Sequence, residues 1–160
     1  MVEHLDKTGC TTGKVLATGI GNGGMLAHHW ACQSDKVDGV VSVGGALQVP
    51  QCAEKRAIPV LMYHGTADTW MPLDGSGHHM TLEHSRKQWA VRNKSSLSVQ
   101  TIADGPLNCR IHDGNADVGV CLVTGMKDYW PGAEDASLNE VSHPLKHASR
   151  GAFEWISKRW

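Results

Sequence analysis

The sequence predicts an α/β protein built on a doubly wound, mostly parallel sheet. Apolar runs at 14–18, 39–43 and 58–63 have the length of buried strands. The last of them, Ile-Pro-Val-Leu-Met-Tyr, is almost wholly apolar, as expected of a strand covered on both faces of a parallel sheet. Helical segments between strands imply right-handed crossovers and helices layered on the sheet.

The composition favours one domain over residues 1–160, long enough to bury a sizeable core. A net charge of −1 gives no reason to expect a nucleic-acid or anionic-membrane partner. No apolar run approaches the length of a membrane span, and the first residues do not read as a signal peptide. The five cysteines form at most two pairs and leave the compartment open.

In the amino-terminal half, local signals predict short elements separated by turns. We expect the end of a helix at 2–8, a turn at 9–13, a strand at 14–18, a helix at 24–32 with Leu26 and Trp30 on one side, a strand at 39–43, a loop through Pro50 and Cys52, and a strand at 58–63.

In the carboxyl-terminal half, apolar spacing predicts two further helices and two further strands. We expect a helix at 81–93 that buries Leu82, Trp89 and Ala90, strands at 97–102 and 118–123, and a closing helix at 144–160 that faces the sheet with Ala148, Ala152, Trp155 and Ile156.

The turn between the first strand and the next helix carries two possible chemistries. Gly19, Gly21 and Gly23 fit the frame of a nucleophile elbow, GxSxG, but with glycine at the apex. The same stretch also reads GxGxxG up to Gly24, which is typical of a dinucleotide phosphate loop. That alternative needs an acid at the end of the following strand, whereas Asp38 stands at its start.

Two further loops are expected at the carboxyl end of the sheet, where open α/β folds place ligands. His64-Gly65-Thr66-Ala67-Asp68 follows the third strand, and residues 125–132 follow the strand at 118–123. These loops and the glycine turn therefore predict a site at one edge of the sheet.

Three motifs in this order, GIGNGGM, HGTAD and YWPG, make the chain resemble the polyhydroxybutyrate depolymerase and feruloyl esterase-like group of α/β-hydrolases. LAHHWAC, GGAL and a WAxRN helix end extend the resemblance over nearly the whole chain. It implies an α/β-hydrolase-like sheet without the family's amino-terminal strands.

When the catalytic triad of the family is mapped position by position onto this sequence, only one of its three residues matches. Its acid falls on Asp68, which matches, but its nucleophile falls on Gly21 and its histidine on Asp128. The oxyanion-hole N–H falls on Asn22, and the second donor belongs to the absent amino-terminal strands. A serine triad needs both the hydroxyl and the imidazole. The resemblance therefore implies a ligand-binding relative with little or no serine-triad hydrolysis.

The residues leave an enzymatic alternative open as well as a binding role. Asp68 and Asp128 can position a water for ester hydrolysis, or they can be solvated loop acids. Trp70 and Trp130 flank the place of the ester's acid group in the family, and either one binds ligand or serves as core. The expected ligand is a small ester or a polyester-like molecule, with no cofactor. His78, His79 and His84 have no recognised metal-ligand spacing, so no metal is expected.

Two structural expectations follow from the resemblance. Cys32 and Cys52 match cysteines often seen in the family, so an exported protein should pair them in a disulfide. The strand at 14–18 lacks its customary neighbour and exposes backbone groups. We therefore expect a homodimer, formed by edge pairing or by exchange of the amino-terminal helix, or else a helix folded over that edge.

Overall fold

A computed structural model describes residues 4, 7–9, 11–52, 55–96, 98–132 and 141–159. The strands are β1 Leu16–Ile20, β2 Gly39–Val43, β3 Val60–Gly65, β4 Val99–Asp104, β5 Leu107–His112 and β6 Val118–Val123. The α-helices are α2 Asn22–Gln33, α3 Leu82–Asn93 and α4 Arg150–Ser157, with 3-10 turns η1 Gly75–Gly77 and η3 Pro144–Lys146. The helix expected at 2–8 lies mostly outside the described residues.

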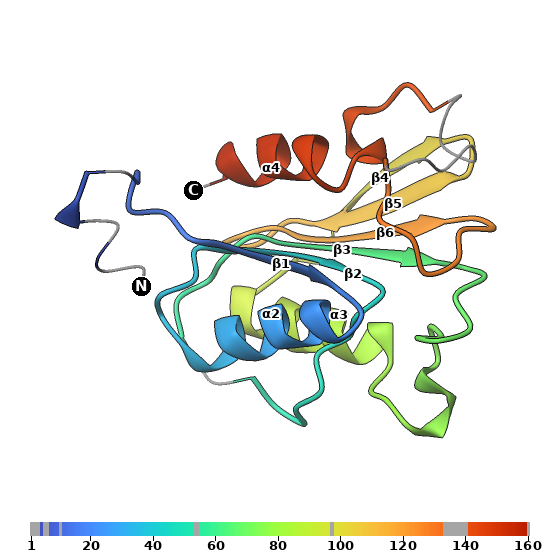
Figure 1. The fold of residues 1–160 in the computed structure, drawn as a ribbon, viewed down its shortest axis with the longest axis horizontal. Coiled ribbons are helices and arrows are strands. Elements are labelled where there is room, and N and C mark those ends of the chain that lie inside the picture. Colours follow the sequence, from blue (N-terminus) through green and yellow to red (C-terminus); the bar gives the residue numbers. More distant parts are fainter. Residues whose placement is uncertain are drawn as a thin grey trace.

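The six strands form one mixed sheet in the order β1-β2-β3-β6-β5-β4 (Figure 1). The first four strands in this order are parallel to one another, whereas β5 and β4 are antiparallel. The predicted α/β class is therefore confirmed, and the parallel part of the sheet holds the three strands that predicted it.

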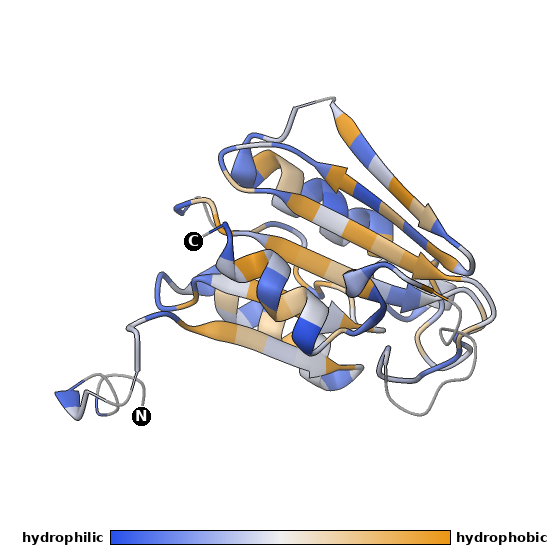
Figure 2. Cartoon of the chain, turned by 90° about the horizontal axis from the view of Figure 1, so that it is seen from above, coloured by the Kyte–Doolittle hydropathy of each residue, from blue (hydrophilic) through white to orange (hydrophobic). Residues whose placement is uncertain are grey.

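Helices cover both faces of the sheet. In Figure 1, α2 and α3 lie on one face and α4 lies on the other. Two buried apolar clusters fill these layers: one contains Val41, Leu61, Ala152 and Ile156, and the other contains Val40, Val60, Met62 and Trp89. Orange, apolar residues follow the central strands in Figure 2. Among the described residues, no helix is long and apolar enough to cross a membrane.

Three predicted strands begin two residues later than expected, and before β1 and β3 side chains occupy the backbone groups. Val15 N–H donates to Asp38 Oδ2 at 2.8 Å, ahead of β1. Ile58 exchanges hydrogen bonds with the Asn93 side chain, so its N–H and C=O are occupied before β3 begins. The strand expected at 97–102 is β4, whereas the strands at 39–43 and 118–123 have their predicted bounds.

The strand β5 was not expected. Its residues alternate between buried and exposed, which is the pattern of a strand with one covered face. It follows β4 through a tight turn at Gly105-Pro106, with Gly105 at φ 55°. This hairpin, inserted before β6, is what makes the sheet mixed.

The prediction of a single closing helix at 144–160 is wrong. The chain forms η3, then a short break with a turn at 148–149, and only then α4. The N–H of Ala148 donates to Pro131 O at 3.0 Å rather than to a carbonyl one turn earlier in a helix. The expected sheet-facing residues are confirmed, because Ala148, Ala152 and Ile156 are buried and Trp155 packs against the same core.

The helix α3 buries Leu82 and Trp89, as expected, and leaves Ala90 half-buried. On α2, by contrast, Leu26 and Trp30 are both exposed. The buried residues of α2 are small or polar: Gly24, Ala27, His28, Ala31 and Cys32.

A buried hydrogen-bonded chain joins α3, α2 and β2. The indole N–H of Trp89 donates to His28 Nδ1 at 2.9 Å, and His28 Nε2 lies 2.8 Å from Ser42 Oγ. Because an indole can only donate, Nδ1 must be unprotonated, and the proton of the neutral ring is on Nε2. All three side chains are fully or almost fully buried.

Two disulfides tie neighbouring segments together. Cys32 and Cys52 are bonded with their Cα atoms 5.1 Å apart, which confirms the expected pair. Cys109 and Cys121 face each other across β5 and β6 and are also bonded, a pair that was not predicted. Cys10 lies outside the described residues.

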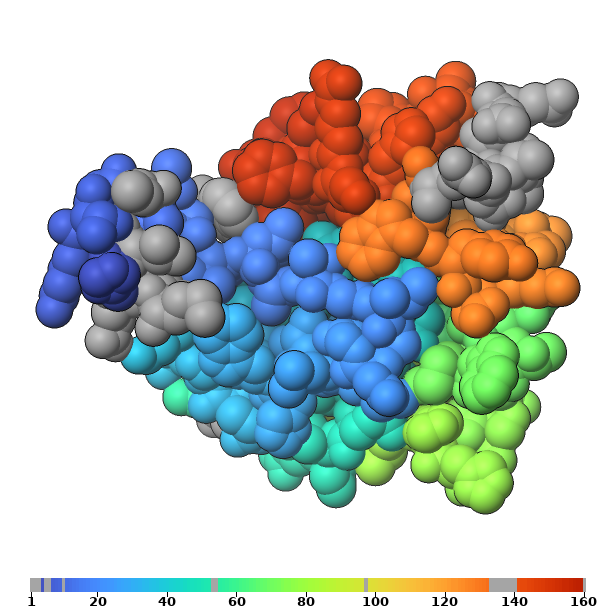
Figure 3. Space-filling model, in the orientation of Figure 1, coloured from blue at the N-terminus to red at the C-terminus, as the bar shows by residue number. Residues whose placement is uncertain are grey.

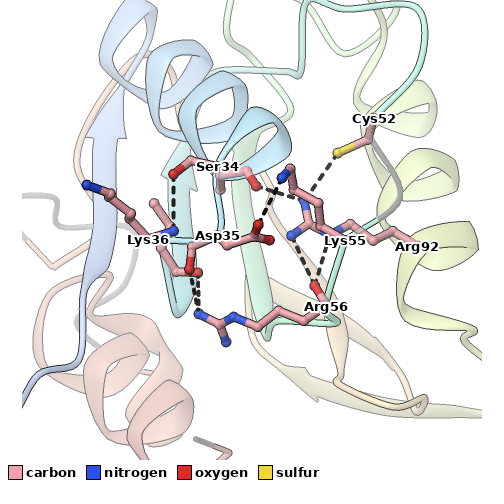
Figure 4. A network of polar contacts seen from close by, with 9 residues as sticks. Ser34, Asp35, Lys36, Cys52, Lys55, Arg56 and Arg92 are labelled. Atoms are coloured by element: carbon pink, nitrogen blue, oxygen red, sulfur yellow. Dashed lines mark hydrogen bonds and ion pairs between the residues drawn. The ribbon is translucent and has the colours of Figure 1, made fainter.

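Arg92 anchors the first disulfide to the end of α2 (Figure 4). Its guanidinium donates to Ala31 O at 2.7 Å and reaches Cys52 Sγ at 3.5 Å. Two further hydrogen bonds go to Arg56 O. Ala31 O is one of the last carbonyls of the helix, which lack intrahelical partners, so Arg92 closes the helix end from α3.

We predict that the protein loses stability as the pH falls below 6.5. Burial lowers the pKa of His28 to about 3. Between pH 6.5 and this value, the imidazole is protonated in the unfolded chain and neutral in the folded chain. The free energy of unfolding should drop by about 2 kcal/mol between pH 7 and pH 5 through His28 alone. Urea unfolding at the two pH values measures this drop.

His28→Gln is the matched variant for this measurement. It should be less stable at pH 7 and should lose less stability on acidification, because burial also lowers the pKa of His64 and leaves that contribution in place. An equal loss in both proteins would show that His28 does not carry the effect.

Candidate functional site

A cleft of about 460 Å³ opens at the carboxyl ends of the parallel strands. Its walls come from the turn after β1, the end of β2, the loop after β3 and the loop after β6. It is lined by Ile20, Gly21, Asn22, Val43, Gly44, Gly65, Asp68, Trp70, Met71, His79, Met126, Lys127 and Asp128. The volume lies within the usual range of small-molecule sites.

Gly21 makes the turn from sheet to helix with a single residue. Its φ of 53° and ψ of −121° fall outside the regions that residues with side chains ordinarily occupy. Its N–H donates to Val43 O at 2.9 Å, and its C=O accepts from Met25 N–H at 3.0 Å. A Cβ built on Gly21 would meet no atom within 4 Å. The conformation of this turn would therefore strain any residue with a side chain, although there is open space in front of it.

The amino end of α2 reaches the cleft with free donors. No side chain caps this helix, and its first turn holds no acidic residue. The N–H groups of the first helical residues have no intrahelical partner, and the helix dipole adds partial positive charge there. Asn22 and Gly21 line the cleft, so a ligand oxygen can accept a hydrogen bond at this point.

Asp68 is held rigidly although it lies in a loop. Its Oδ1 accepts from the N–H groups of Trp70 at 3.0 Å and Met71 at 2.8 Å. The side chain is almost fully buried, and its Oδ2 lies 3.8 Å from His64 Nε2. These two backbone donors, rather than a cation, compensate its charge.

His64 stands beside Asp68 and remains neutral. Its Nε2 is hydrogen-bonded to Met71 O, so Nε2 carries the proton. Burial lowers the pKa of His64, and its Nδ1 is buried with no hydrogen-bond partner among the described residues. His64 thus supports the loop that presents Asp68 and does not line the cleft itself.

The loops after β3 and β6 are fastened to each other, which brings Asp68 and Asp128 to one cleft. Ala67 N–H donates to Met126 O at 3.0 Å, and Gly125 N–H donates to Thr66 Oγ1 at 2.9 Å. A Cβ on Gly65 would collide with the backbone of Met126, so glycine is required for this approach.

The cleft gathers most of the residues that the sequence singled out. Gly21, Asn22, Asp68, Trp70 and Asp128 all line it. Asp128 and Trp70 are exposed at its surface, and Trp70 keeps 77% of its area accessible.

Trp130 does not line the cleft. It packs against the core beneath α4, and its indole N–H donates to Ser149 Oγ at 2.8 Å. Of the two roles considered for this tryptophan, the structure therefore supports the core role.

Sequence reasoning missed several lining residues. His79 comes from the segment after η1, and Met71, Met126 and Lys127 come from the two loops. The pair His78-His79 was visible in the sequence, but nothing local indicated which of the two would reach a cleft. Lys127 and Met126 could have been inferred from their position beside Asp128.

The residues described here hold no group of three or more His, Cys, Asp and Glu side chains that could bind a metal ion. His84, one of the histidines considered, uses its Nε2 on Val49 O at 2.8 Å.

For the dinucleotide-binding alternative, the candidate acid Asp38 does not line the cleft. Asp38 lies before β2 and is bound to Arg56 at 2.7 Å and to Val15 N–H, away from the Gly21 turn.

Comparison with protein-family models and with the sequences of characterised proteins finds no match to this chain.

We predict that Gly21→Ser destabilises the protein by about 1–3 kcal/mol through backbone strain. The new side chain has space, so the loss comes from φ and ψ alone. Gly23→Ser is the matched control, because Gly23 has an ordinary helical φ and its built Cβ also meets nothing within 4 Å. Thermal or urea unfolding of the two variants gives the comparison. Equal effects at the two positions would contradict the strained turn.

Proposed function

We propose that this protein binds a small ester or polyester-like ligand in the cleft beside Gly21 and performs little or no serine-triad hydrolysis. We further propose that it is a degenerate relative of the polyhydroxybutyrate depolymerase and feruloyl esterase-like α/β-hydrolases. The observation that carries the proposal is the meeting of the Gly21 turn, the buried Asp68 and the exposed Trp70 in one cleft.

The arrangement of the elements supports the proposed relationship. A strand, a one-residue glycine turn and a helix stand in the place of a nucleophile elbow. The acid follows β3, and helices cover both faces of the sheet, as a doubly wound α/β-hydrolase fold requires. In this proposal β1 corresponds to the elbow strand.

The chemistry of the cleft suits an ester. Apolar side chains of Ile20, Val43, Met71 and Met126 provide walls for a hydrocarbon part. The N–H groups at the start of α2 can donate hydrogen bonds to the carbonyl oxygen of an ester. Trp70 offers an aromatic face at the rim.

The residues that line the cleft provide no hydroxyl or thiol nucleophile. Gly21 has no side chain, and none of the lining residues is a serine, threonine or cysteine. Asp68 keeps the orienting role of the triad, but its carboxylate faces no imidazole at hydrogen-bond distance, because His64 Nε2 lies 3.8 Å away and binds Met71 O instead. A ligand would therefore be held without being attacked by the protein.

A second function is favoured by one observation: Asp68 and Asp128 line the same cleft. Two carboxylates can hold a water between them and accept its proton during direct attack on an ester. His79 also lines the cleft and adds a titratable group. This hydrolysis would form no covalent intermediate.

For the binding function, we predict that a soluble 3-hydroxybutyrate dimer methyl ester or methyl ferulate raises the melting temperature when its concentration exceeds the dissociation constant. Trp70→Ala should weaken binding about twofold to tenfold, since an aromatic contact contributes about 0.5–1.5 kcal/mol. Isothermal titration calorimetry measures the change.

Tyr129→Ala provides the matched control, because Tyr129 is an exposed aromatic residue beside Asp128 that does not line the cleft. It should bind like the unchanged protein. NAD should produce no shift, because Asp38 is engaged elsewhere. Saturable binding of NAD, or no binding of either ester, would refute the proposed ligand class.

Assays of serine labelling and ester hydrolysis distinguish the two candidate functions. We predict no labelling by an organophosphonate probe and only background release of p-nitrophenol from p-nitrophenyl acetate. If the second function holds instead, Asp68→Asn and Asp128→Asn should each lower a measurable rate by tenfold or more. Asp74→Asn, on an exposed carboxylate of the same loop, should leave the rate unchanged. Stoichiometric labelling of any serine would exclude both candidates.

A further inference from the structure

The carboxylate of Asp68 has one oxygen that receives no hydrogen bond. Its Oδ1 accepts from the N–H groups of Trp70 and Met71 in its own loop. Among the described residues none donates to Oδ2, although the side chain is only 1% exposed. A buried carboxylate oxygen without a donor is costly, because burial removes the water that would otherwise solvate it. Oδ2 is therefore the polar atom of this site that a ligand can still satisfy.

His64 does not supply the missing donor. Its Nε2 lies 3.8 Å from Asp68 Oδ2, outside hydrogen-bond distance, and is hydrogen-bonded to Met71 O instead. Burial lowers the pKa of His64, so the ring brings no positive charge to the carboxylate. The negative charge of Asp68 is therefore left without a cation in the part of the chain that the structure describes.

The unsatisfied oxygen faces the cleft. A Cβ built on Gly44, at the end of β2, would lie 3.0 Å from Asp68 Oδ2, and both residues line the cleft. Glycine therefore leaves the space beside Oδ2 free of side-chain atoms. In Figure 3 the blue segment after β1, the green segment after β3 and the orange loop after β6 come together on the viewed side, where these walls meet.

Gly44 and Gly45 bring Asp68 close to the start of α2. A Cβ on Gly45 would lie 2.4 Å from Gly21 O and 2.9 Å from Met25 N, so Gly45 packs directly against the first turn of the helix. Gly44, the preceding residue, stands beside Oδ2. Because neighbouring Cα atoms are about 3.8 Å apart, the two polar groups are separated by roughly the length of a small molecule. One short ligand can therefore contact both.

The charges and the aromatic ring around Oδ2 favour a cation over a neutral donor. Asp128 adds a second carboxylate to the lining, whereas Lys127 is the one lysine or arginine in it. Lys127 is exposed, and within the described ranges it forms no ion pair with either carboxylate. Trp70 is 77% exposed at the rim, and an indole ring attracts cations to its face.

We propose that the cleft binds an ammonium group at Asp68 Oδ2, so that its preferred ligand is a small amino ester whose carbonyl oxygen lies at the start of α2. An ammonium group brings both the hydrogen-bond donors and the positive charge that this carboxylate lacks. Hydrogen bonds between charged groups are also stronger than those between neutral groups. The ammonium site rests on the proposed function, to which it adds the chemical class of the ligand's second polar group.

Three probes of matched size test the ammonium site. β-Alanine ethyl ester carries an ammonium where ethyl butyrate carries a methyl group, and propylammonium carries the ammonium without an ester. In isothermal titration calorimetry at pH 7, β-alanine ethyl ester should bind about tenfold more tightly than ethyl butyrate, or more. Asp68→Asn should abolish this preference, because asparagine keeps the oxygen that accepts from Trp70 and Met71 but presents an NH₂ group to the ligand.

Asp74→Asn is the matched control, because Asp74 is an exposed carboxylate after the same strand that does not line the cleft. It should keep the preference, which separates a local contact from an effect of net charge. Lys127→Met keeps the test decisive if Asp68→Asn disturbs folding, as judged by circular dichroism. Removing this cation should tighten the binding of β-alanine ethyl ester about twofold to threefold and leave that of ethyl butyrate unchanged.

The three affinities distinguish failure of the ammonium site from failure of the ester-binding function. Equal binding of β-alanine ethyl ester and ethyl butyrate, or a preference that persists in folded Asp68→Asn, would overturn the ammonium site and leave the ester-binding function standing. Equal binding of β-alanine ethyl ester and propylammonium, with no binding of ethyl butyrate, would support the ammonium site and refute the ester-binding function. If no probe binds, both are refuted.

Discussion

The one-residue turn at Gly21 is the constraint on which the rest of this structure depends. The N–H of Gly21 stays in the sheet on Val43 O while its C=O already belongs to α2. The helix therefore starts at the very end of β1, with its free N–H groups aimed at the carboxyl edge of the sheet. Because no side chain is required there, the strain that a residue with a Cβ would suffer is absent.

Beside this turn, the cleft is built by two loops that are fastened to each other. Asp68 is fixed by its own loop backbone, and the loops after β3 and β6 are joined through Met126 and Thr66. A carboxylate, a set of helix donors and an exposed tryptophan thus meet in a cleft whose lining contains no serine, threonine or cysteine.

The helix α2 packs onto the sheet through small residues and leaves its larger apolar residues, Leu26 and Trp30, exposed. The core itself is secured on the opposite flank, by the chain from Trp89 through His28 to Ser42 and by the Cys32–Cys52 disulfide.

The sequence alone determined the α/β class, three of the parallel strands, the glycine turn, and the loop that carries Asp68. These features are local, since each depends on a run of apolar residues or on a glycine whose conformation the neighbours dictate. Tertiary structure alone decided the rest. The hairpin of β4 and β5, the break before α4, the entry of His79 into the cleft and the removal of Trp130 from it depend on contacts between distant segments, such as Ala148 with Pro131 and Trp130 with Ser149. No local pattern specifies which distant backbone or side chain will satisfy a given group, so these placements become visible only once the chain has packed.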